Sequence, residues 1–209
     1  MEIVIFDMDG TLTDSRHNIA VSINYARDVK GLPALDEEVI CEAINALTFQ
    51  ASRRFYGDEP TEEDHRIFAE HYANECLKNL RLYDGIKELL AALKSRGVSM
   101  AVATNATAVF AEKMLTHTGI AGCFKVILGA DCVINPKPAP DMLLKSLALL
   151  NGEAKEAFFV GDSGKDMIAA KTAGIKSVFV KWGYGTEDSF ADFIIKKPCE
   201  LLAVLERPR

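Results

Sequence analysis

The stretch IVIFDMDGTL, residues 3–12, decides the fold of this 209-residue chain. Four apolar residues typical of a buried strand lead into two carboxylates, Asp7 and Asp9, and Gly10 follows directly. In an extended segment, residues two apart point the same way, so these carboxylates would repel each other unless the chain turned or a cation lay nearby. Mg²⁺ prefers oxygen ligands of this kind. The stretch therefore predicts a strand that ends at a metal-dependent site.

Apolar runs alternate with helical stretches from residue 98 onward. Strands are expected at 98–103, 125–128, 157–160 and 177–180, and helices near 109–118, 140–150 and 167–173. Continuous apolar strands separated by helices are typical of a parallel sheet that is covered on both faces. We therefore predict an α/β fold whose core is a Rossmann-like parallel sheet.

The segment between the first acidic motif and the rest of the sheet has a different pattern. Residues 15–81 lack strand-like runs, and their charged and apolar residues alternate at helical spacing. Thr61, followed by three acidic residues, is typical of a helix start. We expect residues 15–81 to form an inserted all-helical domain, and residues 1–14 and 82–209 to form the α/β core.

Composition and charge disfavour several classes of protein. The net charge is −6 without a block of basic residues, which argues against nucleic-acid binding. No apolar run reaches the roughly 18 residues that span a bilayer, and no secretory signal is recognisable. The five cysteines include no Cys-x-x-Cys pair, as expected in a reducing compartment. We expect a cytoplasmic monomer or homodimer that acts on a small molecule, with no membrane partner.

Three further polar motifs lie at or after the ends of the expected strands. Thr104 and Asn105 follow one strand, and residues 161–166, GDSGKD, begin at the end of another. Lys137 lies in a loop between two prolines. The carboxyl ends of parallel strands meet at one edge of a sheet, where ligands bind. All four motifs are therefore expected to converge on one site.

These four motifs, in this order, resemble the signatures of the haloacid-dehalogenase-like hydrolase superfamily. The insertion after the first motif resembles the phosphoglycolate-phosphatase-like subgroup, in which a helical cap closes over the active site. The resemblance covers nearly the whole chain. It implies a Mg²⁺-dependent phosphatase that hydrolyses a small phosphorylated metabolite, a phosphate monoester, through an aspartyl-phosphate intermediate.

Chemistry and the resemblance together assign roles to three residues. Asp7 is the expected nucleophile, and the low intrinsic pKa of an aspartate predicts that it is ionised at neutral pH. Asp9 is the expected general acid for the leaving alkoxide and then the base for water. In the superfamily, the main-chain carbonyl at this position also binds the metal. Lys137 is expected to place a positive charge beside the phosphoryl group and Asp7.

The remaining core residues are expected to bind phosphate and metal. Thr104 is expected to hold phosphate oxygens, and Asn105 to orient the substrate. Asp162 is expected to coordinate the metal directly, and Asp166 to do so through water or to orient the lysine. The metal set is therefore Asp7, Asp9, Asp162 and Asp166. The turn WGYG, residues 182–185, resembles a turn of the same subgroup and is interpreted as structural.

The insertion and the choice of reaction leave alternatives open. Arg53 and Arg54 are candidates to bind a substrate carboxylate, but a solvated helix face explains such a pair equally well. A phosphosugar mutase of the beta-phosphoglucomutase type would share every core motif and differ in its cap contacts. A non-catalytic phosphate-sensing module could use the same scaffold, although such proteins usually lack a catalytic residue. A true dehalogenase is disfavoured because it needs no acidic metal ligands.

Overall fold

The centre of the fold is one parallel sheet, described here from a computed structural model that covers residues 2–46, 51–57 and 60–206. Its strands are β1 (Ile3–Phe6), β4 (Ser99–Ala103), β5 (Val126–Leu128), β6 (Ala157–Gly161), β7 (Lys176–Val180) and β8 (Phe193–Ile195). The order across the sheet is β5-β4-β1-β6-β7-β8, and every neighbouring pair is parallel. The first strand of the chain thus lies near the middle, between β4 and β6.

The register of these pairs aligns the strand ends that carry the polar motifs. Phe6, the last residue of β1, pairs with Val102 of β4 and Val160 of β6. The residues after these positions therefore emerge side by side at one edge of the sheet. Because the chain leaves β1 toward β4 on one side and β6 lies on the other, this edge is a topological switch point, where open α/β sheets bind ligands.

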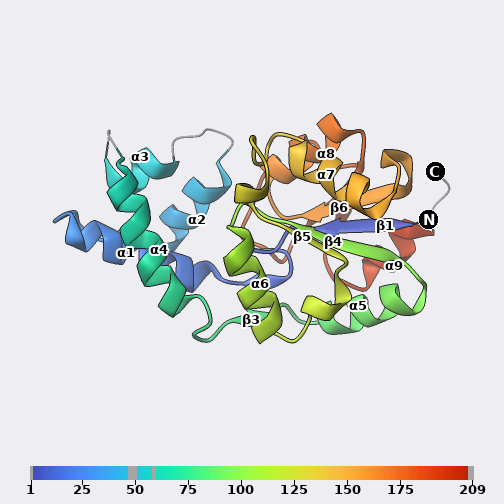
Figure 1. The fold of residues 1–209 in the computed structure, drawn as a ribbon, viewed down its shortest axis with the longest axis horizontal. Helices are drawn as coiled ribbons and strands as arrows, with labels where there is room; N and C mark the ends of the chain where they lie inside the picture. The colour runs from blue at the N-terminus through green and yellow to red at the C-terminus, as the bar shows by residue number, and fades with distance from the viewer. Residues whose placement is uncertain (1, 47–50, 58–59, 207–209) are drawn as a thin grey trace.

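Helices cover both faces of the sheet, as the sequence predicted (Figure 1). One face packs against α5 (Ile86–Ser95), α6 (Ala108–His117) and α9 (Glu200–Leu205). The other face packs against α7 (Asp141–Leu150) and α8 (Gly164–Ala173). Strand β1 serves both layers, because Val4 and Phe6 join the first core while Ile3 and Ile5 join the second. All four of these side chains are fully buried.

A helical insertion lies beside the carboxyl ends of the strands (Figure 1). Its helices are α1 (Arg16–Val29), α2 (Glu37–Asn45), α3 (Ala51–Tyr56) and α4 (Glu62–Glu75). It leaves and rejoins the core through β2 (Thr13–Asp14) and β3 (Arg81–Leu82), which pair antiparallel. The insertion has an apolar cluster of its own, built around Ile23, Ile40 and Phe55. Its helices therefore pack mainly on one another.

The seven strands and helices expected after residue 98 are all present close to their expected bounds. The largest difference is at α8, which begins at Gly164 and not near residue 167. Ser163 and Asp166 form a capping box that starts the helix earlier. The helix start predicted at Thr61 is also present, and there Thr61 and Asp64 form a capping box. No helix in the described part of the chain is long and apolar enough to cross a membrane.

Candidate active site

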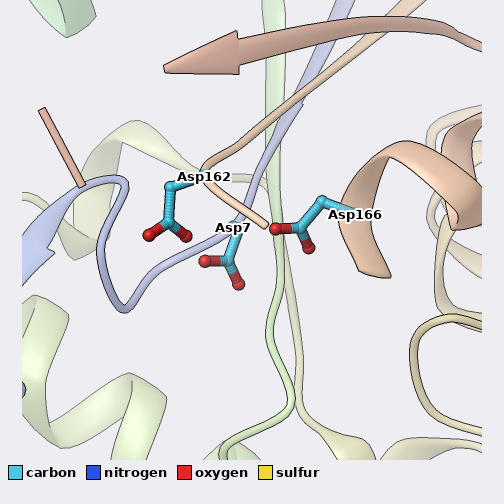
Figure 2. Close-up of side chains that lie close together, drawn as sticks. All are labelled: Asp7, Asp162 and Asp166. Atoms are coloured by element: carbon cyan, nitrogen blue, oxygen red, sulfur yellow. The ribbon is translucent and has the colours of Figure 1, made fainter. Parts of the chain in front are cut away.

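Three carboxylates meet at the switch point of the sheet. Asp7 follows β1, Asp162 follows β6, and Asp166 lies in the first turn of α8. Each contributes an oxygen to a group whose members all lie within 4.8 Å of one another, and all three residues are buried. Figure 2 shows the three side chains side by side. The pairing of β1 with β6 brings together acids that are 155 residues apart in the sequence.

Lys137 lies between two of these carboxylates. Its Nζ donates to Asp7 Oδ1 at 2.6 Å and to Asp166 Oδ1 at 2.7 Å, and the residue is only 3% exposed. Burial alone would lower the pKa of the lysine, but the two carboxylates outweigh it and raise the pKa above its usual value. Lys137 is therefore a fixed positive charge beside Asp7.

Asn105 fixes the loop that carries this lysine. The Asn105 side-chain amide donates to the Lys137 carbonyl at 2.9 Å, and the Lys137 backbone N–H donates to Asn105 Oδ1 at 3.1 Å. These two bonds satisfy both backbone polar groups of Lys137, which lies in a loop without regular secondary structure. Thr104 is buried beside it, and both side chains contribute to the lining of the cavity above the acidic cluster. The two polar residues after β4 thus reach the site as expected.

Asp166 has both carboxylate oxygens engaged within the protein. Oδ1 accepts from Lys137, while Oδ2 accepts from the Ser163 backbone N–H at 3.0 Å and from the Ser163 hydroxyl at 2.6 Å. These bonds combine the helix cap with the orientation of the lysine. Asp166 therefore contributes to the cluster mainly by holding Lys137, one of the two roles that the sequence left open.

Asp162 is held differently, by the backbone of the turn at residues 182–185. Its Oδ2 accepts from the N–H groups of Tyr184 and Gly185, both at 3.0 Å, and its other oxygen accepts no hydrogen bond from the described residues. Burial and then the charge of Asp166 raise the pKa of Asp162 to about 7, against the effect of the two N–H donors. The turn is structural, as predicted, and its structural task is to orient this carboxylate.

Close backbone approach explains why glycine occupies two positions around Asp162. Gly10 has a φ of 85°, and a Cβ there would lie 2.3 Å from Asp162 Oδ2. A Cβ on Gly185 would lie 1.9 Å from the Asp162 carbonyl oxygen. A side chain at Gly10 would collide with the Asp162 carboxylate itself, and one at Gly185 would collide with the backbone that carries it.

Asp9 lies at the cavity but its side chain is turned toward the helical insertion. The Ser15 hydroxyl donates to Asp9 Oδ1 at 2.5 Å. Burial raises the pKa of Asp9, and the bond from Ser15 partly opposes that increase. The Asp9 carboxylate is not part of the three-acid cluster. A metal role for this residue would therefore use its main-chain carbonyl, as the resemblance implied.

The low intrinsic pKa of an aspartate, on which the expected ionisation of Asp7 is based, does not describe Asp7 in its folded environment. Burial is the main cause that raises the pKa of Asp7 well above its usual value, and Asp166 and Asp162 add to it. Lys137 opposes the increase without cancelling it. Sequence alone could not show this, because the desolvation arises only when the strands close around the side chain.

These properties fit a bound divalent cation. Asp7 Oδ2 has only a long contact of 3.4 Å from the Thr11 hydroxyl, and one Asp162 oxygen accepts no hydrogen bond from the described residues. The raised pKa values of these buried carboxylates mean that the positive charge near them does not offset their burial and mutual repulsion. A divalent cation would supply such charge, and carboxylate oxygens are ligands that suit Mg²⁺. Asp7 and Asp162 are therefore the side chains best suited to coordinate an ion directly. Asp166 would contribute indirectly, by holding Lys137 in place through its hydrogen bond.

A cavity of about 490 Å³ opens above the cluster, between the sheet and the helical insertion. Its floor includes Asp7, Lys137 and Thr104. Its walls are largely apolar and aromatic, and they are formed mainly by Ile19, Ile23, Phe55, Tyr56, Phe68, Tyr72 and Phe110. The cavity therefore offers a charged floor for a phosphate group and apolar walls for the carbon skeleton attached to it.

Arg53 and Arg54 do not line this cavity. Both are exposed on α3, and the Arg54 guanidinium lies 4.0 Å from the Glu42 carboxylate. Ser52 and Phe55 of the same helix line the cavity. With about 3.6 residues per turn, the positions between them point to the opposite side. The structure thus brings the predicted core residues together but leaves these two arginines on the outer face of the insertion.

Sequence reasoning missed three residues that shape the site: Ser15, Ser163 and Lys165. Ser15 bonds Asp9, Ser163 bonds Asp166, and Lys165 lines the cavity. The Ser163 role had a readable signal, because Ser-x-x-Asp after a strand is a capping box. The other two had none, since each acts on a segment that is distant along the chain or across a turn.

Comparison with known proteins places this site in a family. The family described as haloacid dehalogenase-like hydrolase matches residues 4–180 of the chain. The phosphoglycolate phosphatase of Aquifex aeolicus is 31% identical over 207 residues, which cover 99% of this chain and 97% of that protein. The N-acetylmuramic acid 6-phosphate phosphatase of Pseudomonas aeruginosa is 33% identical over 216 residues, covering 99% of this chain and 96% of that one.

A solved structure agrees with these sequence matches. The crystal structure of a predicted phosphoglycolate phosphatase from Haemophilus somnus has a TM-score of 0.88 and 30% identity, and the match covers 99% of this chain and 98% of that one. The resemblance inferred from the four motifs is therefore confirmed, and so is its link to phosphatases. The chain belongs to the haloacid dehalogenase-like hydrolase family.

Proposed function

We propose that this protein is a Mg²⁺-dependent phosphomonoester hydrolase that cleaves a small phosphorylated acid through an aspartyl phosphate on Asp7. The observation that carries the proposal is the placement of Asp7 on the cavity floor. There its carboxylate accepts a 2.6 Å bond from the Lys137 ammonium and lies within reach of Asp162. A nucleophile, a fixed cation and a second acid are thus together where a phosphate would enter.

The proposal includes a division of labour between two domains. Residues 1–14 and 82–209 would form the catalytic core, and residues 15–81 would form a cap. A separate apolar cluster in the insertion and the paired β2 and β3 at its root support this division. Closure of such a cap would exclude bulk water from the cavity and strengthen the electrostatic interactions within it.

In the first step, the Asp7 carboxylate would attack phosphorus as the ester P–O bond breaks. The leaving alkoxide would take a proton from Asp9, whose pKa is raised by burial and which is therefore suited to hold that proton. Lys137 would offset negative charge on the phosphoryl oxygens, and Thr104 would contact them. Mg²⁺ held by Asp7 and Asp162 would supply the charge that offsets the repulsion between carboxylate and phosphate.

In the second step, Asp9 would act in reverse. It would take a proton from water as the water oxygen attacks the phosphorus of the aspartyl phosphate. The Asp7 carboxylate would leave, inorganic phosphate would be released, and the proton on Asp9 would serve the next cycle. One residue can perform both proton transfers because the leaving alkoxide and the attacking water occupy the same side of the phosphorus in turn.

Support for an acidic substrate comes from the relatives. One is named for phosphoglycolate and the other for N-acetylmuramic acid 6-phosphate, and both esters carry a carboxylate besides the phosphate. We propose that this chain acts on a substrate of the same kind, most like a phosphoglycolate phosphatase. The cavity has room for either a two-carbon acid or a sugar acid.

A mutase and a non-catalytic phosphate sensor remain the two rival functions. A mutase would return an isomeric phosphate and little inorganic phosphate, so product analysis separates it from a phosphatase. A sensor would bind phosphate esters without turning them over. The presence of Asp7, Asp9 and Lys137 in the arrangement described above favours turnover.

The test is a screen of phosphomonoesters for phosphate release with Mg²⁺ and with excess chelator. It would include phosphoglycolate, N-acetylmuramic acid 6-phosphate, neutral sugar phosphates and nucleoside monophosphates. We expect release that depends on Mg²⁺ and that is lost in Asp7→Asn. Release that is unchanged by the chelator, or that persists in a folded Asp7→Asn variant, would overturn the proposed mechanism.

A further inference from the structure

One corner of the cavity contains a lysine that is bonded to a backbone carbonyl and not to a carboxylate. Lys165, in the first turn of α8, lines the cavity, and its Nζ donates to the Ile44 carbonyl of α2 at 2.7 Å. No carboxylate of the described residues forms an ion pair with it within 4.0 Å. Lys137, which also lines the cavity, is by contrast bonded to two carboxylates. An ammonium group has three donors, so Lys165 retains two for a ligand.

A second donor lies at the same corner. Asn45 follows Ile44 directly, ends α2 and lines the same cavity. Its Nδ2 is buried and has no hydrogen-bond partner in the described structure. A buried donor without a partner costs about 1–3 kcal/mol, and a hydrogen bond to a bound ligand would remove that cost. At the end of α2 the cavity wall therefore contains an amide from Asn45 and an ammonium from Lys165, which is bonded to the preceding residue, Ile44. We call these two residues the Lys165 corner.

The rest of the wall offers little that competes with this corner for an anion. The side chains from α1 and α4 that line the cavity are mainly apolar or aromatic (Ile19, Ile23, Phe68, Ala69 and Tyr72), and His65 is the one basic side chain among them. The arginines of α3 point outward. Among the described residues that line the cavity, Lys165 is the only ammonium besides Lys137, and His65 of α4 is the other basic side chain of the wall. An anionic group on the organic part of a substrate would thus find a lysine that is not bonded to a carboxylate only at the end of α2.

We propose that the Lys165 corner binds the carboxylate of the substrate's leaving group. This inference rests on the proposed phosphatase function and identifies the residues that select its substrate. One carboxylate oxygen accepts from the Lys165 ammonium and the other from the Asn45 amide. The phosphate lies on the floor beside Lys137, and the carbon skeleton spans the apolar wall between the two anions. The substrate is therefore a phosphate ester of an acid.

The bond from Lys165 to the Ile44 carbonyl suggests a purely structural rival. In that view the lysine only ties the core to the end of α2, where carbonyls lack helical partners. A tie of this kind would affect every substrate alike. A carboxylate site affects only substrates that carry the carboxylate. The test therefore depends on matched pairs of substrates and not on activity alone.

Two pairs of esters differ in a group that carries a carboxylate: a carboxylate against a hydroxymethyl group in the first pair, and a lactyl ether against a hydroxyl in the second. Phosphoglycolate pairs with 2-hydroxyethyl phosphate, and N-acetylmuramic acid 6-phosphate pairs with N-acetylglucosamine 6-phosphate. We would measure kcat/KM with Mg²⁺ for both pairs in the wild type, Lys165→Gln, Lys165→Met, Lys165→Arg and Asn45→Ala. Glutamine can still donate to the Ile44 carbonyl but lacks the charge. Lys171→Met, on the exposed side of the same helix, is the matched control.

In at least one pair, the acid should be the better substrate of the wild type. Lys165→Gln and Lys165→Met should lower kcat/KM for that acid by about 10- to 100-fold, the range for a charge-assisted hydrogen bond. Asn45→Ala should lower it by about 3- to 10-fold. The neutral partner should change by less than about threefold, Lys165→Arg should retain most of the preference, and Lys171→Met should match the wild type.

Binding supplies a second measurement that does not need turnover. Titration calorimetry on Asp7→Asn with Mg²⁺, with and without Lys165→Gln, should show about 10-fold or greater weakening for the acid and none for its neutral partner. Equal losses for both members of a pair, or a wild type without preference for either acid, would overturn the carboxylate site while leaving the phosphatase intact. Failure of the wild type to release phosphate from any ester would instead overturn the proposed function.

Discussion

The floor and the wall of the cavity are built on opposite principles. On the floor, charged side chains bond one another: Lys137 joins Asp7 to Asp166, and Asp166 is held in turn by Ser163. On the wall, apolar and aromatic side chains predominate, and the donors of Asn45 and Lys165 are only partly used. The floor is thus organised before a ligand arrives, whereas the wall leaves its polar interactions to the ligand.

This difference assigns chemistry and selection to separate parts of the chain. A preorganised group of charges stabilises developing charge without having to rearrange, which is the main requirement for catalysis. A wall of apolar side chains with a few donors sets which carbon skeleton binds. Two relatives of similar identity to this chain are named for phosphoglycolate and for a much larger sugar acid. Such variation is expected where the wall selects the substrate.

The largest expected effect is on the floor. Asp7→Asn removes the nucleophile but keeps an acceptor for Lys137, so turnover should fall by at least about 10,000-fold while the fold persists. The measurements are phosphate release and thermal unfolding of the same preparation. Because asparagine replaces a buried carboxylate, Tm should not fall. A folded variant with more than a few per cent of wild-type activity would show that the floor does not work through this carboxylate.

The next effect separates the two aspartates of the first motif. Asp9→Asn should slow phosphoenzyme formation by about 100- to 10,000-fold for an alkyl phosphate, which needs a proton on its leaving group. For p-nitrophenyl phosphate, whose leaving group departs without a proton, the loss in that step should be much smaller. Rapid-quench measurement of the two substrates gives the comparison. Similar losses for both would mean that Asp9 is not the acid.

A third prediction concerns the charge that the floor lacks without metal. Burial and Asp166 raise the pKa of Asp162 to about 7 from 3.8. The native state therefore keeps a proton that the unfolded chain loses at lower pH, and the free energy of unfolding falls as pH rises between these values. In chelator, the free energy of unfolding of the wild type should thus fall by about 2–3 kcal/mol between pH 5 and pH 8, relative to that of Asp162→Asn.

Thermal or urea unfolding of both proteins across this pH range measures that difference. Mg²⁺ at pH 8 should then stabilise the wild type and have little effect on Asp162→Asn. A difference that stays constant with pH would show that Asp162 is already ionised in the metal-free protein. It would also remove one reason to regard the floor as short of positive charge.

The smallest expected effect lies outside the wall. Because Arg53 and Arg54 point away from the cavity, each change to alanine should alter kcat/KM for phosphoglycolate and for 2-hydroxyethyl phosphate by less than about threefold. The matched comparison is Lys165→Gln, which should act on the acid alone. A selective loss for phosphoglycolate in Arg53→Ala or Arg54→Ala would move the carboxylate site from the Lys165 corner to α3.

The sequence could predict where the floor residues meet because their positions follow from one rule. Each motif adjoins a strand end or the loop after it, and parallel strands end at the same edge, so Asp7, Thr104 and Asp162 had to converge. The wall had no comparable rule. Whether Ser52 or Arg53 faced the cavity depended on the rotation of α3, and a helix of six residues contains too few turns for its pattern to reveal that rotation.

The sequence by itself determined the α/β core, the helical insertion, the acidic cluster with its lysine, and the family, because these depend on local patterns and on the order of motifs along the chain. Only the tertiary structure decided that Asp7 has a raised pKa and that the turn at residues 182–185 holds Asp162. It also decided that Lys165 reaches the end of α2. Burial, charge proximity and helix rotation arise from contacts between distant segments, and no local pattern encodes them.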